Sequence, residues 1–396
     1  LAVSFVSCDD WLDKTPKDRL YPDVYFKTED ELRLFTNQFY NNLVPSAVDI
    51  YSESSDLIVK SDLMLEMSGQ RIIPDEGNGW NFTALRDINF YLQYSHNCTE
   101  VNARNRYDGV ARFFRAYFYF EKVKRYGDIP WYDKALDSDD PELYKARDSR
   151  EFVMQKMLED LDFAIANLPK TKNAYVLTRW TALALKSRVC LFEGTFRKYH
   201  GLEDYEKYLN ACVSASETFM NESGYTLYKS GSTPYRDLFA SINLQADEVI
   251  FGRDYEASLS VLHNVQNYEN STTMGRPGMN KKIVNSYLMA DGSRFTDKAG
   301  YETMTFDQEC QNRDPRLAQT IRTPGYTRIG STKKEAPNLA YTMTGYHLIK
   351  YSMTANYDEY NKSCNDIPLF RTAEVYLNFA EAKAELGTLK QADINK

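Results

Sequence analysis

The sequence predicts a mainly α-helical protein, with a tetratricopeptide-like scaffold of paired helices and a large loop-rich portion that carries few short strands. Three observations lead to this fold class. In several segments on both sides of the centre, apolar residues recur at the 3.6-residue spacing of a helix. Several of these stretches carry residues that start or stop a helix. The centre, about residues 225–366, is instead rich in Gly, Pro, Asn and Thr, with short apolar runs such as Val249-Ile250-Phe251.

The first predicted helix covers residues 28–43. It starts with the capping-box spacing of Thr28 and Glu31. Its apolar stripe consists of Leu32, Phe35, Phe39 and Leu43. A second helix is predicted for about residues 100–126, with one apolar face of Tyr107, Val110, Ala111, Phe114, Tyr117 and Phe118. Because Phe113 and Phe120 form another apolar face, we expect this helix to pack between two neighbours.

Four further helices follow from the same signals. Their approximate ranges are 148–168, 178–194, 204–220 and 370–387. Pro169 ends the first of them and Gly387 the last, as expected for these residue types. The 178–194 segment contains small residues that let a neighbouring helix approach closely, and Trp180-x-x-Leu183-Ala184 imitates the start of a tetratricopeptide repeat. Stacked helix pairs of this kind are therefore predicted, although no strict 34-residue period runs along the chain.

Composition excludes some functions. The formal net charge is −8, which argues against a nucleic-acid-binding surface. No run of about 18 apolar residues predicts a membrane-spanning helix. Aromatic residues make up 14% of the 396 residues, and 30 of them are Tyr. Such an excess of Tyr calls for a functional use.

The N-terminal segment resembles the end of a bacterial lipoprotein signal. Small and apolar residues run from Leu1 to Cys8 and stop at Asp9 and Asp10. Val6-Ser7-Cys8 fits a lipobox, with Phe5 where Leu is commoner. We therefore expect Cys8 to be the lipid attachment site and residues 1–8 to be the remnant of a signal. The alternative is a buried first strand with an inert Cys8.

Signals for metal, cofactor or catalytic chemistry are weak. The other cysteines (Cys98, Cys190, Cys212, Cys310 and Cys364) lack CxxC spacing, so buried thiols are predicted. The four histidines lack ligand spacing, and the HExxH, GxSxG, Walker A and GxGxxG motifs are absent. No metal, cofactor or catalytic residue is expected. A glycoside hydrolase stays open as an alternative, because two carboxylates among 56 acidic residues are all that it needs.

Four local strings, in this order and after the lipobox, carry a resemblance to a known family. They are Phe26-Lys27-Thr28-Glu29-Asp30-Glu31-Leu32, Arg115-Ala116-Tyr117-Phe118-Tyr119-Phe120 with Arg125-Tyr126-Gly127-Asp128-Ile129-Pro130, Arg313-Asp314-Pro315-Arg316-Leu317, and residues 370–382. The chain resembles the SusD/RagB family of glycan-binding outer-membrane lipoproteins of Bacteroidetes.

The resemblance implies one SusD-like domain over residues 9–396, with family members continuing beyond its last residue. Its helical scaffold would comprise about residues 28–43, 80–220 and 370–396, and its loop-rich ligand-binding part about residues 44–79 and 225–366. It further implies a non-catalytic protein, lipid-anchored at the outer membrane and facing the cell exterior. Such a protein captures oligosaccharide or polysaccharide and delivers it to a TonB-dependent, SusC-like transporter. A helical-repeat scaffold that binds only protein is a second alternative, but it would not explain the lipobox or the Tyr-rich centre.

Two loop regions are the predicted ligand-binding site. Family ligand contacts tend to come from the loop before the third or fourth helix and from the loops after the central helices. The first region, residues 69–81, offers Arg71, Asn78 and Trp80, and the second, residues 253–276, offers Tyr255, His263, Tyr268 and Asn270. Aromatic rings stack on the apolar face of a pyranose while polar groups bond its hydroxyls. Trp80 is equally compatible with a place at the start of a packed helix. The four residues of the second region are also compatible with structural roles.

Overall fold

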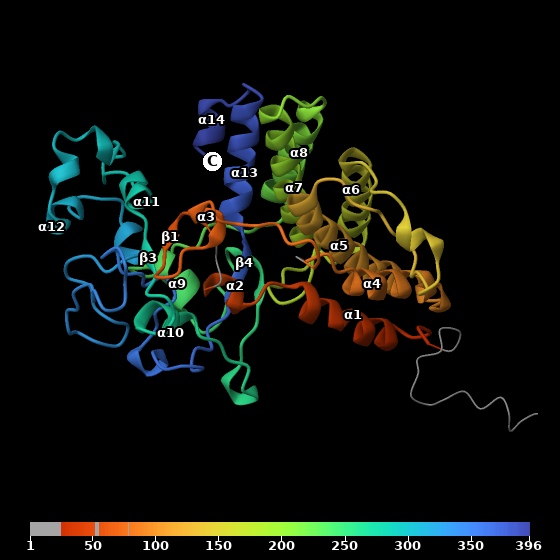
Figure 1. The fold of residues 1–396 in the computed structure, drawn as a ribbon, viewed down its shortest axis with the longest axis horizontal. Coiled ribbons are helices and arrows are strands. Elements are labelled where there is room, and N and C mark those ends of the chain that lie inside the picture. Colours follow the sequence, from red (N-terminus) through yellow and green to blue (C-terminus); the bar gives the residue numbers. More distant parts are fainter. Residues whose placement is uncertain (1–24, 52–54, 78) are drawn as a thin grey trace, which may run out of the picture. The chain divides into compact units, whose positions relative to one another are not determined.

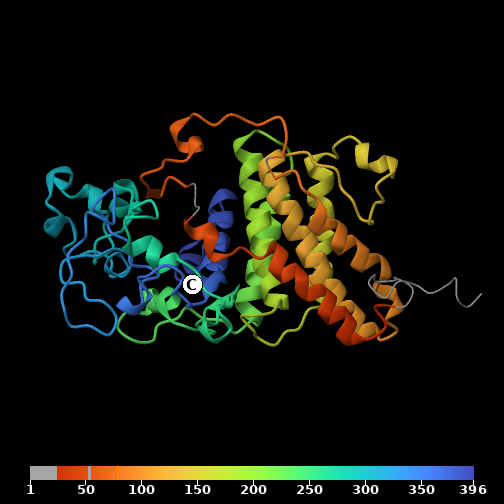
Figure 2. The same cartoon turned by 60° about the horizontal axis from the view of Figure 1, so that its bottom comes forward.

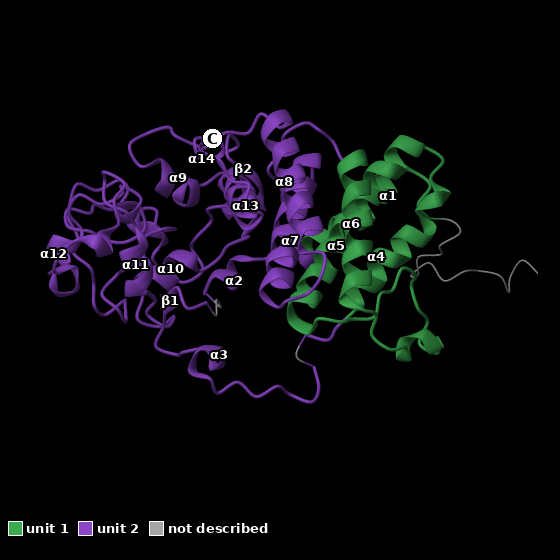
Figure 3. Cartoon of the chain, turned by 90° about the horizontal axis from the view of Figure 1, so that it is seen from above, with its two compact units in different colours: residues 1–42, 82–167 green, residues 43–81, 168–396 purple. Residues whose placement is uncertain are grey.

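The computed structural model describes residues 25–51, 55–77 and 79–396, so Cys8 and Asn78 lie outside the described residues. The chain forms two compact units, coloured separately in Figure 3. Unit 1 consists of residues 1–42 and 82–167, and unit 2 of residues 43–81 and 168–396. The predicted scaffold helices are therefore distributed over both units, while the loop-rich centre belongs to unit 2.

The helices of unit 1 are α1 (Glu29–Leu43), α4 (Thr83–Tyr94), α5 (Val101–Tyr126) and α6 (Arg150–Asn167). The helices of unit 2 are α2 (Ala47–Tyr51), α3 (Leu65–Ser68), α7 (Arg179–Tyr199), α8 (Tyr205–Glu222), α9 (Pro234–Ala240), α10 (Val265–Asn270), α11 (Lys281–Ser286), α12 (Phe306–Glu309), α13 (Thr372–Glu385) and α14 (Gln391–Ile394). Its strands are β1 (Ile58–Val59), β2 (Val249–Arg253), β3 (Gly278–Met279) and β4 (Ile367–Arg371) (Figure 1). Short 3₁₀ turns join many of these elements.

The start of α1 is set by the predicted capping box. The Glu31 N–H donates to Thr28 Oγ1 at 3.3 Å, and the Thr28 N–H donates to Glu31 Oε2 at 3.1 Å. Two donors that would otherwise lack a partner at the helix end are thereby satisfied. The end of α13 also follows the prediction, because Gly387 adopts a left-handed φ of 69° just after the helix.

Helix α5 is packed on two faces, as its sequence predicts. On one face the Phe114 ring lies 5.0 Å from the Tyr40 ring of α1. On another the Arg112 guanidinium lies over the Phe163 ring of α6, 4.3 Å from its centroid. Both Phe113 and Phe114 are almost completely buried. The aromatic residues of this helix therefore build the core of unit 1.

Helices α7 and α8 form a closely packed pair, and α13 packs against both (Figures 1 and 2). The small residues predicted to permit this approach include Ala182, Ala184 and Ser187, all of which are buried. Gly194 of α7 lies very close to α8, because a Cβ atom there would lie 2.7 Å from Leu209 Cδ2. Close helix packing in unit 2 thus depends on the absence of a side chain at this position.

Substituting Gly194 with alanine is expected to lower the free energy of unfolding by about 1–3 kcal/mol, because the added methyl group overpacks the contact between α7 and α8. Chemical unfolding followed by circular dichroism measures this change. Ser214→Ala, at an exposed position of α8, is the matched control and should change the free energy of unfolding by less than about 0.5 kcal/mol. A Gly194→Ala variant as stable as the control would contradict the close packing.

Strands are few and short in the described residues, as predicted. β1 pairs antiparallel with β3, with Ile58 opposite Met279. β2, which contains the apolar run Val249-Ile250-Phe251, pairs antiparallel with β4, with Val249 opposite Arg371. This second pairing connects the central loops to the start of α13, since β4 leads directly into that helix.

The predicted fold class is confirmed: paired helices dominate, and a loop-rich portion carries the short strands. Among the described cysteines, Cys98, Cys190, Cys212 and Cys364 are buried free thiols and Cys310 is half-buried. None of the helices in the described residues is both long and apolar enough to cross a bilayer.

Candidate functional site

Four predicted site residues lie in the interior of unit 2: Tyr255, His263, Tyr268 and Asn270 expose between 3% and 7% of their surface. The Tyr255 hydroxyl accepts a hydrogen bond from the Ala47 N–H at 2.8 Å. His263 Nε2 lies 2.9 Å from the Asn365 carbonyl oxygen. Their side chains thus connect distant loop segments, a structural arrangement that their residue types did not reveal.

The other predicted region, residues 69–81, is exposed. Trp80 exposes 39% of its surface just before α4, and Arg71 forms an ion pair with Glu66 at 3.4 Å. Gly77 has a φ of 73°, and its carbonyl accepts a hydrogen bond from the Trp80 N–H at 2.9 Å. Trp80 is accessible, so a role in ligand binding by this segment stays a prediction.

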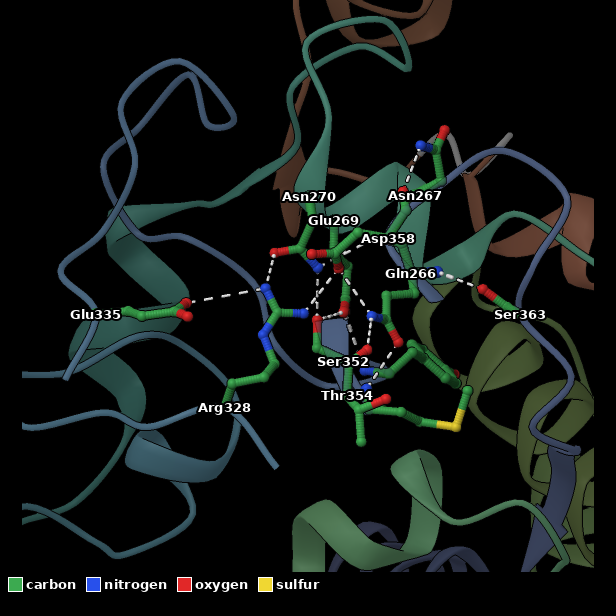
Figure 4. Close-up of polar contacts among 12 residues, drawn as sticks. Gln266, Asn267, Glu269, Asn270, Arg328, Glu335, Ser352, Thr354, Asp358 and Ser363 are labelled. Carbon is green, nitrogen blue, oxygen red and sulfur yellow. Dashed lines mark hydrogen bonds and ion pairs between the residues drawn. The ribbon is translucent and has the colours of Figure 1, made fainter. Parts of the chain in front are cut away.

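Helix α10 is the centre of a buried polar network in unit 2, shown in Figure 4. Gln266 Nε2 donates to the Thr354 carbonyl at 2.7 Å and to Asp358 Oδ1 at 2.8 Å. Glu269 accepts from Ser352 Oγ at 2.7 Å, and burial raises the pKa of its carboxyl to about 7. The buried polar side chains of α10 therefore fix the loop segment that contains Ser352, Thr354 and Asp358.

Asn270 connects this network to two buried arginines. Its Oδ1 accepts from Arg322 Nη2 at 2.6 Å and from Arg328 Nη2 at 3.1 Å. Its Nδ2 donates to Ser352 Oγ at 2.8 Å. Asn270 therefore fixes the positions of both guanidinium groups, as Figure 4 shows for Arg328.

The two arginines line a hollow of about 500 Å³ on unit 2. Its other polar lining residues are Lys333, Glu335, Asn338, Tyr341 and Asp358. Arg322 pairs with Glu335 at 3.1 Å, and Arg328 pairs with Asp358 at 2.8 Å. The hollow thus presents fixed hydrogen-bond donors and acceptors beside one aromatic ring.

The electrostatics of the hollow are set by burial and by these pairs. The Arg322 and Arg328 side chains expose 6% and 5% of their surface. Burial lowers the pKa of the Arg322 guanidinium, and the charge of Glu335 acts against this effect. The polar groups of the lining, which are guanidinium, ammonium, carboxylate, amide and hydroxyl groups, match a ligand rich in hydroxyl groups.

None of the residues predicted from the sequence lines this hollow, although Asn270 contacts two arginines that do. Arg322, Arg328 and Asp358 come from loops that are far apart in the sequence, and no local motif joins them. The spacing of Arg322 and Arg328 in a loop region was the one available signal, and it is a weak one. In the described part of the chain, no cluster of three His, Cys, Asp or Glu side chains could hold a metal ion.

Comparison with known proteins adds an independent line of evidence. Residues 238–396 match the SusD family model, and residues 69–179 match a family model described as starch-binding and associating with the outer membrane. SusD-like protein P2 of Formosa agariphila is 25% identical, over 98% of this chain and 76% of its own length.

Solved structures agree in fold. A SusD-like protein from Bacteroides fragilis superposes with a TM-score of 0.75 at 21% identity, covering 96% of this chain and 80% of that one. A SusD-like carbohydrate binding protein from the same species superposes with a TM-score of 0.71 at 18% identity, covering 93% of this chain and 77% of that one. The hollow and its α10 network lie within the residues that match the SusD family model.

Proposed function

Because the chain belongs to the SusD/RagB family, we propose that it captures oligosaccharide at the outer membrane and delivers it to a TonB-dependent, SusC-like transporter. SusD-family proteins are non-catalytic glycan-binding proteins. Cys8, which lies outside the described residues, is proposed as the lipid attachment site that anchors the protein facing the cell exterior. Several long acyl chains would hold it there, at about 0.8 kcal/mol for each buried methylene.

We place the sugar in the hollow of unit 2. The observation that carries this proposal is the set of polar side chains around it, which the α10 network fixes before any ligand arrives. Preorganised groups lose little conformational entropy on binding. The Tyr341 ring offers an apolar surface for a pyranose, while Lys333 and Asn338 can bond its hydroxyls.

The carboxylates of this region suit binding better than hydrolysis. Glu335 and Asp358 are each engaged by a buried arginine, at 3.1 Å from Arg322 and 2.8 Å from Arg328. Glu269 has the raised pKa of a general acid, but it exposes 2% of its surface and is enclosed by Tyr351 and Ser352. A glycosidase acid must touch the glycosidic oxygen.

Tyr341→Ala is expected to weaken glycan binding at least about tenfold, equivalent to about 1.4 kcal/mol, because the stacking surface is lost. Calorimetry with a panel of polysaccharides measures the affinity of the full chain, and an assay of reducing ends after long incubation tests for cleavage. Tyr144→Ala, at a residue with 86% exposure in unit 1, is the matched control and should bind like the parent.

Two results would contradict this assignment. If Trp80→Ala abolishes binding while Tyr341→Ala leaves it unchanged, the sugar binds to the 69–81 segment instead. If new reducing ends appear and vanish when one carboxylate is replaced, the protein is an enzyme.

A further inference from the structure

One turn of the hollow on unit 2, residues 338–341, carries two of the groups that the proposed function assigns to the sugar, Asn338 and Tyr341. The Tyr341 N–H donates to the Asn338 carbonyl at 2.9 Å, and the Ala340 N–H donates to Asn338 Oδ1 at 3.0 Å. These bonds set the shape of the turn. They do not set its position on unit 2, because both partners of each bond belong to the turn.

The inner side of the turn is held by His347, which is fully buried. The Asn338 N–H donates to His347 Nδ1 at 3.2 Å, and His347 Nε2 lies 2.8 Å from the carbonyl oxygen of Glu269 in α10. The Tyr341 ring meets the imidazole edge to face, with 6.0 Å between the ring centroids. The turn is therefore connected to the buried α10 network at its inner side.

A second side chain, Arg276, reaches the same turn and is not among the residues that line the hollow. Its Nε donates to the Ala340 carbonyl at 2.9 Å, and its Nη2 donates to the Leu339 carbonyl at 2.7 Å. The planar guanidinium thus binds two adjacent carbonyls at once, which the ammonium group of a lysine does not reproduce. In the described part of the chain, Arg276 and His347 are the two side chains from outside the turn that bond to its backbone.

The backbone of Arg276 is fixed in an unfavourable conformation. Its φ is 52°, in the left-handed region that residues other than glycine rarely adopt. The Met343 N–H donates to the Arg276 carbonyl at 2.9 Å, and the Ser61 N–H donates to the carbonyl of the preceding Gly275 at 2.8 Å. Strained conformations persist where the surrounding contacts over-determine them. The point from which the guanidinium reaches the turn is therefore itself held by two separate segments.

We propose that Arg276 is a positioning residue of the glycan site, which holds the 338–341 turn so that the Tyr341 ring is in place before the sugar binds. This inference rests on the proposed function. Leu339 exposes 68% of its surface, so burial of this side chain does little to fix the turn, and the two hydrogen bonds from Arg276 do so instead. A turn that must be ordered on binding costs affinity, and a fixed turn avoids this cost.

Arg276→Met removes the guanidinium and keeps an apolar side chain. Calorimetry of the full chain with the panel of polysaccharides should show binding about fivefold weaker than in the parent, while the midpoint of chemical unfolding changes little. Arg276→Lys keeps the charge without the planar fork and should recover only part of the lost affinity. Arg294→Met, at an exposed arginine of unit 2, is the matched control and should bind like the parent.

Two further readouts separate positioning from a general loss of structure. In the Tyr341→Ala background, adding Arg276→Met should weaken binding less than about twofold, because the ring that Arg276 positions is absent. In the absence of sugar, amide hydrogen exchange in the peptide that covers residues 338–341 should be at least about threefold faster in Arg276→Met than in the parent. Exchange in a peptide from α7 should be unchanged.

Every other result overturns the inference. If Arg276→Met binds like the parent, or if its loss of affinity persists in the Tyr341→Ala background, Arg276 does not act through the ring. Full recovery in Arg276→Lys assigns the effect to charge, and unchanged exchange means that the turn is held without Arg276. An Arg276→Met variant that does not fold shows a general structural role.

Failure of the proposed function gives a different pattern. If the parent binds no polysaccharide of the panel, or if Tyr341→Ala binds like the parent, the assignment of the sugar to this hollow is wrong and the positioning role falls with it. Hydrogen exchange in the sugar-free protein still shows in that case whether Arg276 holds the turn. If Tyr341→Ala weakens binding and Arg276→Met does not, the proposed function stands and the positioning role alone is wrong.

Discussion

Asp160→Asn is expected to lower the free energy of unfolding by about 3–5 kcal/mol, because it leaves the Arg115 guanidinium buried without its counter-charge. Arg115 Nε donates to Asp160 Oδ2 at 2.6 Å and Nη2 donates to Oδ1 at 2.8 Å, so the pair is bidentate. The two side chains expose 8% and 2% of their surface. Chemical unfolding of the full chain, monitored by circular dichroism, measures the loss.

The surroundings of this pair explain why the loss is large. Arg115 Nη1 donates to Asn89 Oδ1 at 3.2 Å, and Asn89 Nδ2 in turn donates to the Tyr132 carbonyl at 2.8 Å. Burial acts to lower the pKa of Arg115, yet the hydrogen bonds and the charge of Asp160 raise it. Without Asp160, the guanidinium keeps its charge and loses the group that stabilises it.

Two variants serve as controls for Asp160→Asn. Asp30→Asn breaks an exposed ion pair with Arg33 and should cost less than about 1 kcal/mol. The double replacement Arg115→Met with Asp160→Leu removes both charges and should recover much of the loss. An Asp160→Asn variant within about 0.5 kcal/mol of the parent protein would show that water reaches the pair.

The helical scaffold was predictable because its signals are local. The capping box of Thr28 and Glu31, the two aromatic faces around Phe114 and the stop at Gly387 each depend on residues a few positions apart. Periodicity reports which side of a helix is buried. The same reasoning could not find the Arg115–Asp160 pair, whose residues lie 45 positions apart in two helices.

The candidate site was less predictable for the same physical reason. Tyr255, His263 and Tyr268 were selected for residue type in a loop-rich region, and burial depends on contacts between distant segments. Helix α10 lies in the centre that the sequence predicts to be loop-rich, and all its side chains are buried, because loops around Ser352 and Asp358 cover them. Asn270 was predicted to contact the ligand; in the structure it is buried and bonds Arg322 and Arg328, which line the hollow.

Two buried histidines are expected to make the protein lose stability as the pH falls below about 6.5. His347 is fully buried and His263 exposes 3% of its surface. Burial, together with the charges of Arg322 and Arg328, lowers the pKa of His347 to about 3, and burial lowers the pKa of His263 to about 4. The hydrogen bonds agree with neutral rings. In each ring Nδ1 accepts from a backbone N–H (Asn338 or Val265), which leaves Nε2 as the donor to a backbone carbonyl.

The sign of the effect follows from proton binding. Between the lowered pKa and 6.5, the unfolded chain binds a proton at each histidine that the folded chain does not, so stability falls with decreasing pH. As the pH falls from above 6.5 to the lowered pKa of each histidine, the free energy of unfolding decreases by about 5 kcal/mol for His347 and about 3 kcal/mol for His263. Glu269 acts in the opposite direction, because its pKa of about 7 means that stability is lost as the pH rises from 4.5 to 7.

His347→Gln should therefore flatten the dependence of unfolding free energy on pH between 6.5 and 4.5, by about 2 kcal/mol over that interval, while Glu269 contributes equally to both proteins and cancels. Chemical unfolding at a series of pH values measures the slope, and the NMR titration of the histidine rings reports their pKa values directly. His96→Gln, at an exposed histidine, should keep the parent slope. If His347→Gln keeps it too, or if the His347 ring titrates near 6.5 in the folded protein, then Nδ1 takes up a proton in the folded state and cannot accept from the Asn338 N–H. In that case the closed α10 network does not describe the protein in solution.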